Sequence, residues 1–222
     1  MHSSLNQIIL LNNRIKEIRD KKQLKTYPKI IVVSKTFPLE KIKPLIDSGH
    51  IHFGENKIQE AEIKWSEIKK INKNIKLHMI GKLQSNKAKN AIKLFDYIHS
   101  LDNEKLALKL SQQQNNLGKK CKFFIQVNLA NEENKSGISS NLLNNFYKYC
   151  THDLSLNVIG LMCLPPIDLD PNKYFSILKK NAELLNLPEL SMGMSSDYED
   201  AVENGSTFLR LGTAVLGNRS IT

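Results

Sequence analysis

The sequence predicts an α/β fold, namely a single (β/α)8 barrel of the TIM type with an extra N-terminal helix. Short runs rich in β-branched and aromatic residues alternate with helical segments along almost the whole chain. The 222 residues suit one such barrel and would crowd two ordinary domains. No linker or low-complexity tract divides the chain, so we expect one domain over residues 1–222.

The N-terminal helix is expected at about 3–25, because Leu5, Ile8, Ile15 and Ile18 recur at helical spacing. The expected strands are 29–34, 52–53, 76–80, 97–99, 122–128, 158–164, 189–192 and 208–211. The helical segments between them are 39–48, 58–71, 85–94, 103–116, 140–150, 174–185 and 197–204. This order gives eight βα units without a final helix, and an open doubly wound sheet is the alternative that periodicity leaves open.

The composition argues against several classes of protein. The formal net charge is +10, but the lysines are scattered and form no Arg-rich run or basic stripe with aromatics. We therefore expect no nucleic-acid partner, although the charge keeps nucleic-acid binding as a third hypothesis, with salt-sensitive binding as its signature. No segment resembles a signal peptide or a membrane span, and the three cysteines have no metal or redox spacing. These features predict a cytoplasmic protein without a membrane partner or a metal site.

The first expected strand ends at Lys35, which the barrel model places at the mouth of the barrel. Function in such barrels is concentrated at the carboxyl ends of the strands. A lysine held against an apolar wall loses solvation of its ammonium form, so its amine becomes a usable nucleophile toward an aldehyde. Most single lysines are solvated surface residues, and position alone does not decide between the two.

Two turns near the C-terminus have the residues of a phosphate site. Residues 191–197 (SMGMSSD) and 210–214 (RLGTA) follow the last two expected strands, where such barrels bind phosphate. Gly193 allows a close approach of the backbone, and Ser195 or Ser196 is a candidate helix cap, Ser196 forming a capping box with Glu199. A plain turn with a good cap is the alternative. The acidic residues of the same first turn argue against a phosphate there.

Arg210 lies two residues before Gly212, so both face the same side of the expected strand. An arginine buried in the barrel without a partner would be costly, which favours a ligand beside it. Three further positions are weaker candidates. Asn56 follows the second strand and suits a ligand hydroxyl, His78 is better explained as a core residue, and Lys135 as an exposed loop lysine, with a second, looser amine site as its alternative.

Together these segments resemble the YggS/PROSC family of pyridoxal phosphate homeostasis proteins, which look like the barrel domain of alanine racemase. The matching motifs are VSKT (33–36), FGENKIQE (53–60), HMIGKLQSNK (78–87), KSG (135–137), GLM (160–162), LSMGMS (190–195) and the segment 205–217. They occur in the family's order. The chain departs from the family at Leu77 and Met79, where the family usually has Trp and Phe, and residues 166–190 form a shorter stretch than usual.

The resemblance implies a site for pyridoxal 5′-phosphate (PLP). Lys35 matches the family's Schiff-base lysine, Arg210 matches the arginine near the pyridine ring, and Asn56 matches a residue near the cofactor. Four positions match those beside the cofactor phosphate: Ser191, Ser195, Gly212 and Thr213. The resemblance also implies a role in vitamin B6 and amino-acid homeostasis.

We expect a binding protein without catalytic residues, because an arginine beside the pyridine nitrogen leaves that nitrogen unprotonated and the electron sink weak. Racemisation also needs an acid–base group on each face of the substrate. In similar racemases the second group is a tyrosine of an added domain. We expect that domain to be absent here, because the chain ends at Thr222. Without it, a monomer is expected. Such a protein would release or transfer PLP to apo-enzymes. The alternative is a PLP-dependent racemase or lyase acting on small amino acids, which α-proton exchange in deuterated water would reveal.

Overall fold

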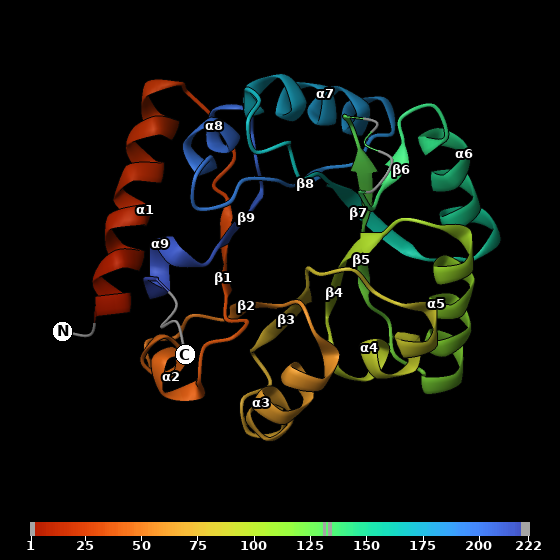
Figure 1. Cartoon of the computed structure of the whole chain (residues 1–222), viewed down its shortest axis with the longest axis horizontal. Coiled ribbons are helices and arrows are strands. Elements are labelled where there is room, and N and C mark those ends of the chain that lie inside the picture. The colour runs from red at the N-terminus through yellow and green to blue at the C-terminus, as the bar shows by residue number, and fades with distance from the viewer. Residues whose placement is uncertain (1–2, 131, 133–134, 219–222) are drawn as a thin grey trace.

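The computed structural model describes residues 3–130, 132 and 135–218 and contains a closed barrel of eight parallel strands (Figure 1). The barrel strands are β1 (Lys29–Val33), β2 (His52–Glu55), β3 (Lys76–Met79), β4 (Tyr97–Leu101), β5 (Lys122–Asn128), β7 (Asn157–Met162), β8 (Glu189–Ser191) and β9 (Phe208–Leu211). They follow the order β4-β3-β2-β1-β9-β8-β7-β5, and the pairing of β4 with β5 closes the ring. The predicted barrel is therefore confirmed, and the open-sheet alternative is excluded.

Helices surround the strands on the outside of the ring (Figure 1). They are α1 (Ser3–Lys21), α2 (Leu39–Asp47), α3 (Ile58–Ile71), α4 (Ala88–Leu94), α5 (Glu104–Leu117), α6 (Leu143–Lys148), α7 (Pro171–Leu184), α8 (Tyr198–Glu203) and α9 (Thr213–Leu216). A 3-10 turn, η1 (Ser85–Lys87), precedes α4, and a π-helical turn, η2 (Tyr149–Asp153), extends α6. The predicted N-terminal helix is confirmed as α1, which packs against α2, α8 and α9 beside the junction of β1 and β9.

Two elements differ from the expectation. The short helix α9 follows the last strand, where no helix was expected, because Thr213–Leu216 is too short to show helical periodicity. A two-residue strand, β6 (Ile138–Ser139), pairs with the end of β5 outside the eight-strand ring.

The core has two parts on opposite sides of the strands. The larger part lies between strands and helices, and the smaller part fills the inside of the barrel. The interior residues are Ile31, Tyr97, Phe124, Met162 and Phe208. Because side chains alternate along a strand, Arg210 shares the inward face of β9 with Phe208 and lies one step closer to the carboxyl end. None of the described helices has an apolar stretch long enough to cross a membrane.

Candidate functional site

A cavity of about 700 Å³ lies at the carboxyl ends of the barrel strands. Its wall contains segments that follow most of the barrel strands. The lining residues are Val33, Lys35, Phe37, Asn56, Ile80, Gly81, Lys82, Gln126, Val127, Asn128, Lys135, Ser136, Leu164, Met194, Ser195, Ser196, Arg210, Gly212 and Thr213. Six of the seven residues predicted for the cofactor site are among them: Lys35, Asn56, Ser195, Arg210, Gly212 and Thr213.

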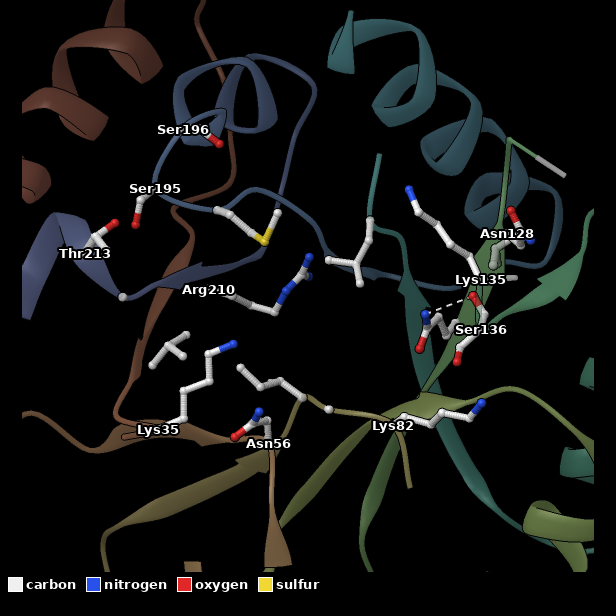
Figure 2. Close-up of a pocket in the computed structure, with 18 of the residues that line it drawn as sticks. Lys35, Asn56, Lys82, Asn128, Lys135, Ser136, Ser195, Ser196, Arg210 and Thr213 are labelled. Carbon is white, nitrogen blue, oxygen red and sulfur yellow. Dashed lines mark hydrogen bonds between the residues drawn. The ribbon is translucent and has the colours of Figure 1, made fainter. Parts of the chain in front are cut away.

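Lys35 lies two residues past the end of β1 and is half-buried. Its neighbour Ser34 is fully buried and donates its hydroxyl to Glu55 Oε1 at 2.8 Å, while Thr36 has the positive φ of 66°. Figure 2 shows the amine end of Lys35 directed into the cavity, toward the side from which Arg210 enters. The strand end and its two flanking residues thus position this amine.

Asn56 forms the wall of the cavity next to Lys35 (Figure 2). Its Oδ1 atom is buried and has no hydrogen-bond partner among the described residues. Gly81 packs on the Asn56 backbone so closely that a Cβ there would lie 2.6 Å from the Asn56 carbonyl oxygen. A buried acceptor without a partner costs free energy, so this oxygen indicates a donor supplied by a ligand.

On the opposite side from Lys82 and Lys135, three hydroxyl residues gather: Ser195, Ser196 and Thr213 (Figure 2). Ser195 Oγ accepts a hydrogen bond from the Ala214 N–H at 3.1 Å, which ties the turn after β8 to the turn after β9. Thr213 opens α9, so its N–H has no partner within that helix. Hydroxyls and N–H groups of this kind suit a phosphate.

The predicted capping box of Ser196 and Glu199 is wrong. Asp197, not a serine, precedes α8, and its Oδ1 accepts from the Met194 N–H at 2.5 Å. Glu199 turns outward, where Arg14 donates to both of its carboxylate oxygens at 3.1 and 2.7 Å. The outward pairing of Glu199 weakens the objection that acidic residues in this turn would repel a phosphate.

Arg210 is 4% exposed and enters the cavity from β9 (Figure 2). Its Nη1 donates to Ser191 Oγ at 2.7 Å and its Nη2 to the carbonyl oxygen of Cys163 at 2.9 Å. Burial lowers the pKa of the guanidinium from its ordinary value. Among the described residues Arg210 forms no salt bridge, so its remaining N–H groups can be used by a ligand.

Ser191 is the one predicted site residue that does not line the cavity. It is fully buried, and its hydroxyl lies between Arg210 and His99 Nδ1, the latter at 2.8 Å. The residue supports the wall of the cavity through Arg210. The resemblance alone placed Ser191 beside the phosphate, whereas Ser195, four residues later, reaches the cavity.

The other two of the three weaker candidates, His78 and Lys135, differ in placement. His78 is fully buried in the barrel and does not reach the cavity, as expected for a core residue. Lys135 lines the cavity, and Glu132 pairs with its ammonium at 2.8 Å.

Sequence reasoning missed several polar lining residues, among them Gln126 and Asn128. Both belong to the carboxyl end of β5, and Gln126 Nε2 donates to the Ser136 carbonyl oxygen at 3.0 Å. Their place at a strand end was the available signal. In the described part of the chain, no group of His, Cys, Asp or Glu side chains is arranged to hold a metal ion.

Comparison with known proteins agrees with this architecture. Residues 10–220 match the family model of the alanine racemase N-terminal domain. An alanine racemase structure from Clostridium difficile shares the fold with a TM-score of 0.71 at 13% identity, covering 95% of this chain and 56% of that chain.

Closer relatives have the length of this chain. A pyridoxal phosphate homeostasis protein of Pasteurella multocida is 34% identical over 212 residues, 91% of each chain, and one of Synechocystis is 36% identical over 200 residues, 86% of this chain and 91% of that one. The structure of PipY from Synechococcus elongatus with PLP bound has a TM-score of 0.79 and 34% identity, covering 91% of this chain and 100% of that chain. The chain therefore belongs to the family of pyridoxal phosphate homeostasis proteins, whose barrel is that of the alanine racemase N-terminal domain.

Proposed function

We propose that this protein binds PLP in the cavity as a Schiff base on Lys35 and takes part in intracellular PLP and amino-acid homeostasis. The observation that carries the proposal is the convergence of an amine, a buried guanidinium and a hydroxyl-lined turn pair on one cavity. PLP supplies an aldehyde, which a lysine amine converts to an imine with loss of water. The relative with PLP bound supports the same ligand here.

The residues fit the three polar parts of this ligand. The turns with Ser195, Gly212 and Thr213 suit its phosphate, and Arg210 offers donors to its ring nitrogen. Asn56 Oδ1, which is buried without a partner, offers an acceptor to a ligand donor. The cavity of about 700 Å³ lies in the range of small-molecule sites.

We infer that the protein is a carrier and not an enzyme. No described carboxylate pairs with Arg210, and a guanidinium has donors only, so Arg210 beside the ring nitrogen would leave that nitrogen unprotonated and the electron sink would be weak. No tyrosine is among the lining residues of the described cavity, so a second acid–base group is missing there. Release of PLP to apo-enzymes, a cytoplasmic location, and a monomeric single domain complete the proposal.

The first experiment is a visible spectrum of the purified protein with PLP, followed by borohydride reduction and peptide mass mapping. We expect a yellow protein with one phosphopyridoxyl adduct, on Lys35. Lys35→Ala removes the imine and leaves the fold intact, whereas Lys82→Ala, at another lysine of the same cavity, keeps the imine. Adducts on scattered lysines, or an unchanged imine spectrum in Lys35→Ala, would refute the assignment.

The alternative function is a PLP-dependent racemase or lyase for small amino acids. Incubation of the PLP-loaded protein with alanine or serine in deuterated water separates the two. A carrier leaves the α-proton in place over hours. An enzyme exchanges this proton for a deuteron, so the amino acid becomes one mass unit heavier.

A further inference from the structure

A chain of hydrogen bonds runs through the inside of the barrel and ends on Arg210. His52 Nδ1 lies 3.0 Å from His78 Nε2, and His78 Nδ1 lies 2.9 Å from His99 Nε2. His99 Nδ1 lies 2.8 Å from Ser191 Oγ, which accepts from Arg210 Nη1 at 2.7 Å. The five side chains come from five different strands, β2, β3, β4, β8 and β9.

Aromatic side chains enclose the chain inside the barrel. His78 stacks on Tyr97 and His99 stacks on Phe124, each with ring centroids 4.3 Å apart. Phe208 contacts both histidine rings from the side. These apolar walls leave the rings of His78 and His99 with only each other and the two ends of the chain as hydrogen-bond partners among the described residues.

The imidazoles are neutral, so each has one donor and one acceptor nitrogen. Burial lowers the pKa of His78 and of His99 well below the usual value, and it lowers the pKa of His52 to about 4. In such a chain the proton position on one ring fixes the proton position on the next.

Ser191 determines which group donates and which accepts in each hydrogen bond from Arg210 to His52; we call this order the direction of the hydrogen-bond chain. Its Oγ accepts from Arg210, and the other described partner of that oxygen is His99 Nδ1. A serine oxygen can accept two hydrogen bonds, but the Ser191 hydrogen would then have no acceptor among the described residues. The arrangement that leaves no buried donor unpaired has the Ser191 hydroxyl donating to His99 Nδ1, with the His99 proton on Nε2. His99 then donates to His78 Nδ1, and His78 Nε2 donates to His52 Nδ1.

We propose that His52, His78, His99 and Ser191 form a positioning relay that holds the Arg210 guanidinium opposite Lys35. Ser191 and the Cys163 carbonyl fix two of its N–H groups, and the others remain directed at a ligand. The relay makes the placement of Arg210 depend on His52, at the opposite end of β2 from the cavity wall. The effect on a ligand rests on the proposed function, whereas the direction of the relay does not.

The ligand-free protein tests the direction. With 15N-labelled histidine, long-range nitrogen–proton NMR spectra distinguish the two tautomers of each ring. We expect His78 and His99 to be protonated at Nε2 alone, at pH 7. A His99 ring protonated at Nδ1, or averaged between the two forms, would overturn the relay whether or not PLP binds.

Variants test the coupling to the cavity. His78→Phe keeps a ring against Tyr97 but removes both hydrogen bonds, which leaves a buried donor on His99 unpaired. Because the free-energy cost of leaving a buried donor unpaired corresponds to about a tenfold change in affinity, we expect PLP to bind about tenfold more weakly. We also expect the absorption maximum to shift. Tyr97→Phe preserves the stacked ring and all the hydrogen bonds, so it serves as the control, with affinity unchanged within about twofold.

Substitution of His52, the half-buried residue at the far end of the hydrogen-bond chain from Arg210, tests the same coupling with a smaller expected effect. In His52→Phe the Nε2 proton of His78 loses its acceptor, so either direction of the hydrogen bonds leaves one buried donor unpaired. We therefore expect loss of the single Nε2-protonated form of His78 and a smaller fall in PLP affinity. This variant replaces His78→Phe if the latter does not fold. Unchanged His78 signals and unchanged PLP affinity in a folded variant would overturn the relay. If the unmodified protein binds no PLP on Lys35, the proposed function fails, and the histidine spectra of the free protein still decide the relay.

Discussion

The ammonium of Lys64 lies 2.7 Å from the backbone carbonyl oxygen of Ser34, the residue immediately before Lys35. The same ammonium contacts Glu60 Oε1 at 3.1 Å, and that oxygen accepts the Thr36 N–H at 2.5 Å. The backbone on both sides of Lys35 is thus held by one ion cluster on α3. The cluster explains how Thr36 keeps its positive φ of 66°, which is unfavourable for a β-branched residue.

We predict that Lys64→Met destabilises the protein by about 3–5 kcal/mol, the usual cost of breaking a buried ion pair. The Lys64 side chain is 9% exposed, and its partner Glu55 is fully buried, so the variant leaves a buried carboxylate without its cation. Urea denaturation measures the change. Lys43→Met is the control, because the pair of Lys43 and Asp47 is exposed and contributes at most about 1 kcal/mol. Equal losses in both variants would contradict the prediction.

Gly81→Ala is expected to weaken PLP binding about tenfold, because it displaces the polar side chain of Asn56 and the loss of one hydrogen bond is of this magnitude. A Cβ at Gly81 would lie 2.6 Å from the Asn56 carbonyl oxygen and 2.7 Å from Asn56 Cβ, so Asn56 must move from the cavity wall. Titration with PLP measures the affinity. Gly49→Ala strains a backbone with φ 89° outside the cavity, so it should lower stability and leave the affinity unchanged. Unaltered PLP affinity in Gly81→Ala would show that Asn56 has no part in the site.

Gly212→Ala separates ligand binding from packing. A Cβ at Gly212 would approach Val33 Cβ no closer than 3.5 Å, an ordinary contact, so we expect stability to change by less than about 0.5 kcal/mol. The added methyl group narrows the turn where the phosphate is proposed to bind, and inorganic phosphate and PLP should both bind more weakly. A variant that binds both as well as the original protein would move the phosphate site away from this turn.

The barrel could be predicted from the sequence because the signals are local. Alternating β-rich and helical segments fix the order of the elements, and the strand-end rule then places Lys35, Asn56 and Arg210 at one mouth. The relay of histidines could not be predicted in this way. His52, His78 and His99 are distant in sequence, and their contacts depend on the stagger of neighbouring strands, such as the pairing of His78 with Tyr97. The capping box failed for a similar reason, because Glu199 finds Arg14 on a helix 185 positions away.

Acid is expected to destabilise the fold through the interior histidines. An unfolded imidazole takes up a proton near pH 6.5, whereas burial holds the pKa of His78 and of His99 well below that value and lowers the pKa of His52 to about 4. Below pH 6.5 the unfolded chain therefore binds more protons than the folded chain, and the free energy of unfolding falls as the pH falls. The stability that these buried neutral histidines contribute is fully present above pH 6.5. Below that pH it decreases by about 1.4 kcal/mol per pH unit for each such histidine.

Urea denaturation between pH 7.5 and 5 measures this slope. The raised pKa values of the partly buried Asp102 and Asp197 act in the opposite direction, so the comparison with variants matters more than the absolute slope. His78→Phe removes one of the buried imidazoles, and with it the one proton that this group takes up on unfolding. The slope of the free energy of unfolding against pH should therefore fall by about 1.4 kcal/mol per pH unit. His152→Gln replaces an exposed histidine outside the barrel interior and is the matched control for the substitution. Stability that stays constant from pH 7.5 to 5 would mean that the interior imidazoles accept protons in the folded barrel, and a neutral relay with a single direction would then be untenable at acid pH.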